Sequence, residues 1–303
     1  MNQFLSRYKR LGVIFDPEAV ILKPSLRVNT LKISDEELVA RLTAKGVVLE
    51  KIPYLSHGYF YSSEFSISSS EEYLLGYVYL QEAASQLPPE VLFSGIDISK
   101  LDPKVKVLDL CAAPGSKTTQ LAAILDDKIP IFALDDVAPR LDKLHDNLVR
   151  LGIGSVITFR KDGRFVDDLK TMFDFILLDA PCSGNFCVEK DFFTNRSVLM
   201  GVKNNSFTQL SLLKAAWRVL KPGGYIVYST CSLEPEEDEV LIDEFLSLKE
   251  DAELVDTKLS FGDEGFTEVF GKTLDQSLSL TRRFWPHKTN TEGFFIAKLR
   301  KKK

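Results

Sequence analysis

Residues 105–117 read VKVLDLCAAPGSK, and the fold follows from this stretch. An apolar run over 105–110 precedes small residues and Gly115, and a segment with helical periodicity comes next. A short buried strand, a tight turn and a helix are the repeating parts of a parallel sheet. Because ligands bind outside the carboxyl ends of such strands, the residues directly after each strand are the candidates for chemistry.

The same alternation continues from this stretch toward the end of the chain. Apolar runs predict strands at 105–110, 129–134, 156–159, 173–178 and 225–229, and helical periodicity predicts helices at 117–125, 139–151, 206–220 and 236–248. Residues 221–224, Lys-Pro-Gly-Gly, predict a helix stop and a turn, and residues 293–299 predict an added last strand. The fold class is therefore α/β, built on one open sheet.

Upstream of residue 104 the pattern predicts a smaller α+β lobe. Strands are expected at 25–33, 47–52 and 58–61, and Ser34 with Glu37 forms a capping box for a helix that runs to about Lys45. A helix over 71–86, ended by the prolines at 88–89, would link the lobe to the sheet. We therefore expect two domains, 1–88 and 89–303.

Composition and charge are those of an ordinary globular chain, with one asymmetry. The net charge is −5, yet residues 1–60 hold nine Lys/Arg against six Asp/Glu. A basic N-terminal lobe on an otherwise acidic chain suits a protein that binds the phosphates of a nucleic acid, although an ordinary solvated surface explains the charges equally well. The four cysteines do not indicate a disulfide framework, and no apolar run is long enough to cross a membrane. We expect a cytoplasmic protein without a metal site.

Carboxylates and cysteines follow the predicted strands. Asp135 and Asp162 come after the second and third strands, Asp179 after the fourth, and Cys182 and Cys231 after the fourth and fifth. The acid at Asp135 lies 20 residues beyond the glycine of the first turn, the spacing of an acid that holds ribose hydroxyls. Each acid alone is as well explained as a helix cap or turn residue, and each cysteine as a small buried hydrophobe. Their joint placement favours one site for a nucleoside-containing ligand.

The chain resembles a known family in six segments. LDLCAAPGSKTTQLA at 108–122, DAPCSGN at 179–185 and YSTCSLEPEEDE at 228–239 are similar to the signature motifs of the RsmB/Nop2/Sun family of RNA 5-methylcytosine methyltransferases. RVNTLK at 27–32, GYVYLQEAAS at 76–85 and EGFFIAKL at 292–299 add to the resemblance, which is strongest for the archaeal-type tRNA enzymes. The family implies a Rossmann-like class I methyltransferase sheet with a small RRM-like N-terminal lobe.

The resemblance also implies a cofactor, a substrate and site residues. S-adenosyl-L-methionine would be bound by Cys111, Ala112, Ala113, Pro114, Gly115, Ser116, Lys117, Asp135, Arg140, Asp162 and Asp179. Ser116 departs from the glycine usual in the family, and a serine fits there if its φ angle is negative. Of the adjacent acids Asp135 and Asp136, we favour Asp135 because it ends the apolar run. The expected partner is RNA, with tRNA favoured over rRNA, and the chain is expected to be a monomer.

The implied reaction needs a nucleophile from the protein, because carbon 5 of cytosine is itself too poor a nucleophile to attack a sulfonium methyl group. Cys231 matches the cysteine that adds to carbon 6, Asp179 would neutralise the charge that develops on the ring, and Cys182 would assist release of the product. Cys231 should therefore be partly exposed. Cys187 is expected to be a packing residue.

The lobe offers further candidates. The cations Arg27 and Lys32 could contact phosphates, and the aromatic residues at 59–61 could stack bases, although aromatic residues are more often core. Alternatives to the main interpretation are an rRNA enzyme, a methyltransferase acting on small molecules or proteins, and an RNA assembly factor that binds the cofactor without catalysis.

Overall fold

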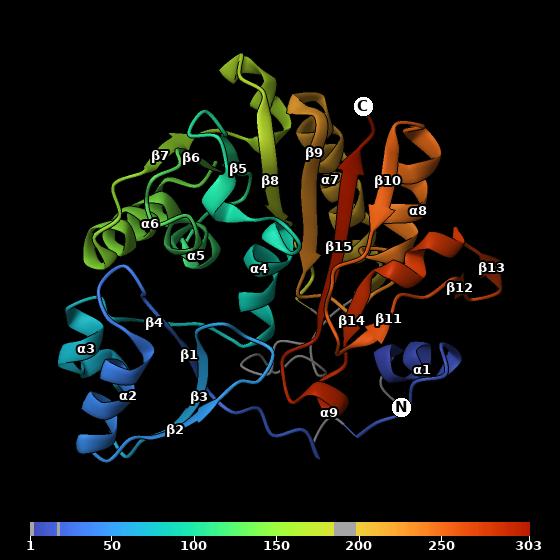
Figure 1. The fold of residues 1–303 in the computed structure, drawn as a ribbon. Coiled ribbons are helices and arrows are strands. Elements are labelled where there is room, and N and C mark those ends of the chain that lie inside the picture. The colour runs from blue at the N-terminus through green and yellow to red at the C-terminus, as the bar shows by residue number, and fades with distance from the viewer. Residues whose placement is uncertain (1–2, 17–18, 185–197) are drawn as a thin grey trace.

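The computed structural model describes residues 3–16, 19–184 and 198–303, and a twisted mixed sheet forms its centre (Figure 1). The strands of this sheet are β5 (Val107–Asp109), β6 (Ile131–Asp135), β7 (Val156–Arg160), β8 (Phe173–Asp179), β9 (Leu220–Thr230), β10 (Ala252–Val255), β11 (Asp263–Glu264), β14 (Arg282–Phe284) and β15 (Phe294–Lys301). Their order is β11-β14-β15-β9-β8-β5-β6-β7, with β10 on β15. All six strands predicted for this part of the chain are present, and the α/β prediction is confirmed.

The strand order reverses beside β5, and this reversal places the site. β5 to β9 are parallel; β6 and β7 lie on one side of β5, and β8 and β9 on the other. Such a topological switch point leaves a crevice outside the carboxyl ends of the strands. The turn predicted at 221–224 lies inside β9. There the pairing with β8 is irregular, because Phe173 pairs with Leu220 but Phe175 pairs with Tyr225.

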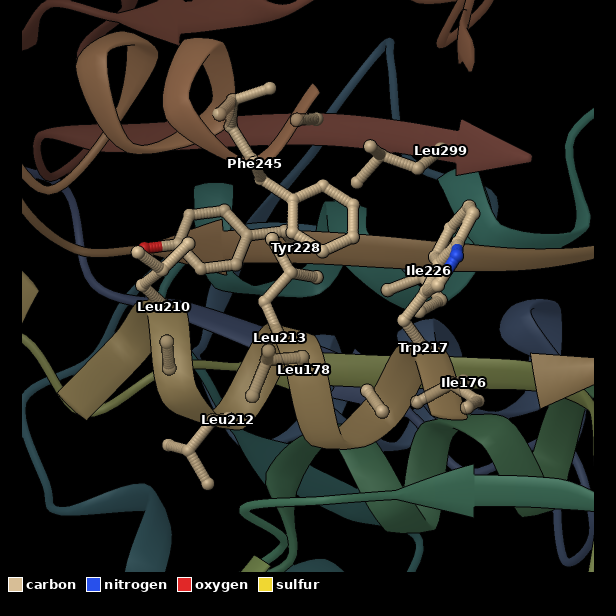
Figure 2. Packing of buried hydrophobic residues seen from close by; sticks show 14 of the residues in the cluster. Ile176, Leu178, Leu210, Leu212, Leu213, Trp217, Ile226, Tyr228, Phe245 and Leu299 are labelled. Atoms are coloured by element: carbon tan, nitrogen blue, oxygen red, sulfur yellow. The ribbon is translucent and has the colours of Figure 1, made fainter. Parts of the chain in front are cut away.

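Helices cover both faces of the sheet. One face carries α4 (Leu87–Phe93), α5 (Ser116–Ile124) and α6 (Ala138–Leu151), and the other carries α7 (Val198–Val219) and α8 (Glu239–Leu248). Side chains of a strand alternate between the faces, so Ile226 and Tyr228 pack with Trp217 and Phe245 while Val227 packs toward α4 and α5 (Figure 2). The packed faces hold the strand ends, and therefore the site, in fixed positions.

The N-terminal lobe is a four-stranded antiparallel sheet in the order β2-β3-β1-β4. Its elements are β1 (Ser25–Val28), α2 (Asp35–Ala44), β2 (Val48–Lys51), β3 (Gly58–Ser62), η2 (Ile67–Ser69), α3 (Glu71–Leu74) and β4 (Val78–Leu80). The Ser34 hydroxyl accepts a hydrogen bond from the Glu37 backbone N–H at 3.1 Å, which confirms the predicted start of α2.

The predicted helix over 71–86 is wrong. The chain forms α3, then β4, then η3 (Ala84–Gln86), and the prolines at 88–89 begin α4 rather than end a helix. α3 stops because Gly76 has φ +75°, and a Cβ there would lie 2.0 Å from the Arg150 carbonyl oxygen. Proline suits the first turn of a helix because the N–H groups there have no acceptor within the helix.

Several elements had no counterpart in the prediction. They are α1 (Gln3–Arg10), η4 (Ile98–Lys100), η5 (Gly163–Leu169), β12 (Glu268–Val269), β13 (Lys272–Thr273), η6 (Gln276–Leu280) and α9 (Pro286–Thr289), besides β10, β11 and β14. Phe4 and Tyr8 of α1 pack with Leu233 and Trp285, so this helix contacts the C-terminal part of the chain. A domain boundary at residue 88 remains a prediction. Among the described residues, no helix is long and apolar enough to span a membrane.

Candidate active site

A cavity of about 380 Å³ lies at the switch point, a size that suits a small-molecule ligand. Eight of the predicted site residues line it: Cys111, Ala113, Asp135, Arg140, Asp162, Asp179, Cys182 and Cys231. Ala112, Pro114, Gly115, Ser116 and Lys117 do not line it. Asp136, Lys161, Arg164 and Thr208 also line it, although the sequence did not single out the last three.

The loop between β5 and α5 needs its glycine. Gly115 has φ +103°, and a Cβ at this position would lie 2.6 Å from Cδ1 of Leu144 on α6. Only glycine therefore fits both the backbone angle and the packing. Ser116 is the first residue of α5 and does not have a positive φ, so the serine fits as expected.

Asp135 is buried where β6 ends. Its carboxylate accepts hydrogen bonds from the backbone N–H groups of Ala113, at 3.3 Å, and Val137, at 3.0 Å. Arg140 lies 3.4 Å from the same carboxylate and donates to the Ala113 carbonyl oxygen at 2.5 Å. The acid and the arginine thus fix the loop between β5 and α5 and face the cavity together, whereas the side chain of Asp136 is exposed.

Asp162 precedes η5 and pairs with Arg164. The Arg164 guanidinium lies 2.6 Å from the carboxylate, and the backbone N–H of Arg164 donates to it at 2.9 Å. These hydrogen bonds hold the pKa of Asp162 below its usual value, so it is a carboxylate at neutral pH. The only sign of Arg164 in the sequence was its position, two residues after Asp162.

Asp179 ends β8 and is held from two sides. The buried Lys117 ammonium donates to one carboxylate oxygen at 2.6 Å, and the Ser229 hydroxyl donates to the other at 2.7 Å. Lys117 also donates to the Ser85 hydroxyl at 2.9 Å. Lys117 therefore acts on the cavity through Asp179 and does not line it.

The two candidate cysteines meet on the cavity wall. Their Sγ atoms lie 2.9 Å apart, and both side chains are partly exposed, as expected for Cys231. The hydrogen bond to Cys231, together with loss of solvent, raises the pKa of Cys182 well above its usual value. Cys182 therefore keeps its proton at neutral pH and can donate it in a hydrogen bond to the Cys231 sulfur. Cys187 lies outside the described residues.

Sequence reasoning missed a set of acids directly after Cys231. Glu234, Glu237, Asp238 and Glu239 are all fully buried, although a run of acids normally indicates a solvated surface. Arg283, also fully buried, lies 3.1 Å from Asp238 and 2.5 Å from Glu239. Arg7 of α1 lies 2.9 Å from Glu234. Only the tertiary contacts with α1 and β14 show that these acids are internal.

The phosphate contact proposed for Arg27 is not available, whereas the contact proposed for Lys32, which is exposed, stays a prediction. Arg27 is buried and donates to the Gln81 side chain at 3.1 Å and to the Thr119 hydroxyl at 2.9 Å. Lys32 donates to the Arg150 carbonyl oxygen, near the C-terminus of α6, at 2.8 Å. These cations join the lobe to α5 and α6 because they find acceptors there.

The aromatic residues at 59–61 belong mainly to the core of the lobe. Tyr59 and Phe60 are buried, and Tyr61 is partly buried. No group of three or more metal-binding side chains gathers within the described ranges.

Comparison with known proteins identifies relatives over nearly the whole chain. The family model for 16S rRNA methyltransferase RsmB/F matches residues 98–300, and the model for the N-terminal domain of 16S rRNA methyltransferase RsmF matches residues 17–83. Ribosomal RNA small subunit methyltransferase F of Shewanella woodyi is 38% identical over 295 residues, which cover 92% of this chain and 57% of that protein. The chain thus spans a little over half of that relative.

Two archaeal proteins match over most of their own length. The tRNA (cytosine(49)-C(5))-methyltransferase of Pyrococcus abyssi is 39% identical over 286 residues, covering 92% of this chain and 88% of that protein. The crystal structure of a methyltransferase homologue from Pyrococcus horikoshii superimposes with a TM-score of 0.83 at 39% identity, covering 94% of this chain and 88% of that one. The chain therefore belongs to the 16S rRNA methyltransferase RsmB/F family, whose cofactor is S-adenosyl-L-methionine.

Proposed function

We propose that this chain is an RNA (cytosine-5) methyltransferase that acts on tRNA through a covalent Cys231–cytosine adduct. The observation that carries the proposal is the cysteine pair. Two sulfur atoms 2.9 Å apart, on the ends of neighbouring parallel strands, share a cavity with Asp179. A methyltransferase that acts without covalent attack has no need for two thiols in this place.

The residues around the cavity fit the cofactor. Asp135 would hold the ribose hydroxyls and Asp162 would border the adenine, with Arg140 beside them. The kind of residue present supports the fit, because the carboxylates of Asp135 and Asp162 and the guanidinium of Arg140 line one cavity of about 380 Å³. When bound, S-adenosylmethionine supplies an electrophilic methyl group.

Cys231 and Asp179 would activate the base. The Cys231 thiolate forms a bond to carbon 6, and the electrons of the carbon 5–carbon 6 double bond make carbon 5 nucleophilic. Asp179, with Lys117 2.6 Å away, would hold a proton at ring nitrogen 3 and so neutralise the charge on the ring. Because the target base must leave its stack to reach the cavity, the substrate presents it flipped or in a loop.

Cys182 would assist the release of the product. After methylation, carbon 5 must lose its proton. The electrons of that carbon–hydrogen bond then restore the ring double bond while the sulfur–carbon 6 bond breaks and returns the Cys231 thiolate. Once the Cys231 sulfur is bonded to carbon 6, its hydrogen bond and its charge no longer raise the pKa of Cys182, so Cys182 can release its own proton to solvent and then take the proton from carbon 5.

The test is adduct trapping. Cys182→Ala protein is mixed with unmodified tRNA and S-adenosylmethionine and run on a denaturing gel. The proposal predicts a slowly migrating protein–RNA band that is absent from the Cys182→Ala/Cys231→Ala double variant. A band that persists without Cys231, or methyl transfer at the wild-type rate by Cys231→Ala protein, would refute the covalent mechanism.

The choice of tRNA over rRNA is tested by the same gel. The alignment with the Pyrococcus abyssi tRNA enzyme extends over 88% of that protein, and this breadth supports tRNA. The similar identity to the Shewanella rRNA enzyme makes small-subunit rRNA the second candidate. Trapping of rRNA fragments but not of tRNA would replace the first substrate with the second.

A further inference from the structure

One buried carboxylate contacts the turn that carries Cys182. Glu237 is fully buried, and its carboxylate accepts hydrogen bonds from the Ser183 backbone N–H at 3.0 Å and the Ser183 hydroxyl at 2.6 Å. The Gln209 side-chain amide donates to it at 3.3 Å. In the part of the chain described, no lysine or arginine pairs with it. Its charge is therefore stabilised by neutral donors alone, two of them from residue 183.

The backbone of Glu237 is fixed to the strand that carries Cys231. Its carbonyl oxygen accepts a hydrogen bond of 2.6 Å from the buried Tyr228 hydroxyl, and its N–H donates to the Glu234 carbonyl oxygen at 3.0 Å. Tyr228 lies on β9, three residues before Cys231. Glu237 thus links the Cys182 turn to a rigid part of the sheet.

Two further contacts hold the same turn. Gln209 of α7 donates to the Pro181 carbonyl oxygen at 2.9 Å, and the hydroxyl oxygens of Ser183 and Ser232 lie 3.2 Å apart. Both contacts involve a residue adjacent to one of the two cysteines, and so do the two hydrogen bonds from Ser183 to Glu237. Together they determine how closely the two sulfur atoms approach.

We propose that Glu237 is a positioning residue that holds the turn at 181–183 against Cys231 and so sets the separation of the two thiols. The importance of this separation for catalysis rests on the proposed function, in which Cys231 and Cys182 are the two reacting thiols. The geometric part does not depend on any reaction.

The physical case is the cost of burying this charge. A carboxylate without a cation is expensive to bury unless several donors bind it, and here the donors belong to the turn. If the turn moved away, the charge would lose its two hydrogen bonds from Ser183. The hydrogen bonds that stabilise the buried Glu237 carboxylate therefore also hold the turn at 181–183 in place beside Cys231. The Glu237 charge also helps to raise the pKa of Cys182, after the hydrogen bond to Cys231 and burial.

The experiment measures how fast the two thiols form a disulfide in the full-length protein without RNA. Diamide accepts the two electrons and two protons that Cys182 and Cys231 lose, and mass spectrometry of quenched samples gives the rate. Glu237→Gln keeps the size of the side chain but replaces one acceptor oxygen with an NH₂ group, which faces the Ser183 and Gln209 donors. We expect the disulfide to form about 10-fold more slowly.

The matched control is Glu236→Gln, which changes the adjacent acid of the same motif. Glu236 pairs with Arg7 at 2.7 Å and makes no contact with the turn, so the wild-type disulfide rate is expected. Equal rates in Glu237→Gln and wild type would overturn the proposal. If Glu237→Gln does not fold, Ser183→Ala removes the 2.6 Å bond to Glu237 together with the 3.2 Å contact to Ser232, and should slow the disulfide about threefold. An unchanged rate there also overturns the proposal.

Methylation assays separate this inference from the proposed function. With active enzyme, Glu237→Gln should accumulate the covalent RNA band as Cys182→Ala does, with cofactor affinity unchanged. If wild-type protein forms no adduct but the disulfide rates differ as expected, the proposed function fails and the positioning role stands. If the adduct forms and Glu237→Gln turns it over at the wild-type rate, the positioning role fails and the function stands.

Discussion

The rim acids of the cavity, Asp135, Asp162 and Asp179, differ from the buried acidic segment at 234–239 in their surroundings. Each rim acid lines the cavity and has a basic partner nearby, so a ligand can reach it. Four acids of the segment, Glu234, Glu237, Asp238 and Glu239, are fully buried, line no part of the cavity, and bind arginines or the Cys182 turn. The same residue types thus line a cavity in one region and stabilise the interior in the other, and the binding role of the rim acids is the proposal made above.

The difference teaches that contact with the cavity, and not the presence of an ion pair, separates the two roles. An exposed or partly exposed pair contributes little to folding, because water competes for both charges. A fully buried pair is costly to break, because the remaining charge has no other solvation. Substitutions in the two regions should therefore change different measured quantities.

The largest effect is expected for Arg283→Met. It leaves Asp238 and Glu239 buried without their cation, and the free energy of unfolding should fall by about 3–5 kcal/mol. Urea denaturation measures the change. Arg164→Met, which removes the half-exposed partner of a rim acid, is the control and should leave the free energy of unfolding close to the wild-type value. Equal losses in the two variants would remove the distinction between the regions.

The second effect concerns pH. Burial raises the pKa of Asp109 to about 7, from 3.8 for an unburied aspartate. Between these values the folded chain keeps a proton that the unfolded chain releases, so Asp109 lowers stability as the pH rises from about 4 to about 7, by up to about 4 kcal/mol.

Asp109→Asn tests this assignment by removing the titration. Urea unfolding at pH 4.5, 6 and 8 should show a flatter pH dependence in the variant and a relative gain in its stability above pH 7. An unchanged slope would mean that another group, and not Asp109, takes up the proton.

A third effect is expected on turnover. Asp179→Asn removes the charge that pairs with Lys117 beside the cysteines, and methyl transfer should slow about 100-fold. The buried Lys117 ammonium then faces only neutral acceptors such as the Ser85 hydroxyl, so the free energy of unfolding should also fall, by about 1–3 kcal/mol. Single-turnover methylation measures the rate. A loss of stability without loss of rate would place Asp179 with the architectural acids.

The smallest effect is expected on cofactor binding. Asp135→Asn should weaken S-adenosylmethionine binding about 10-fold, because a charge-assisted hydrogen bond becomes a neutral one. Calorimetric titration measures the affinity, and Asp136→Asn, the exposed neighbour, should change it less. A larger loss of affinity in Asp136→Asn than in Asp135→Asn would assign the ribose contact to Asp136 instead.

Local patterns were sufficient for the strands and helices of the sheet. Six strands and four helices follow from local patterns, because a buried strand appears as a short apolar run and each helix buries a stripe that repeats every 3.6 residues. The region at 71–86 failed because its helical pattern is broken by Gly76, whose close approach to Arg150 is a tertiary contact. The two-residue strand β11 has too few residues for any period to show.

The site divides in the same way. Its carboxylates and cysteines follow predicted strands, so their convergence could be predicted from topology without coordinates. Arg164, the link from Lys117 to Asp179 and the role of Glu237 could not, because each depends on partners brought from other elements. The contact of Arg27 was predicted wrongly for this reason: a cation in a sequence does not reveal which acceptor it will meet.

The sequence by itself determined the sheet, the loop glycine and the rim on which Asp179, Cys182 and Cys231 meet, since these depend on periodicity and on the residue types at the end of each strand. Only the tertiary structure decided which acids face the cavity and which are buried, and that the two sulfur atoms lie 2.9 Å apart. The reason is physical: burial and pairing arise between segments distant along the chain, and no local pattern encodes the distance between them.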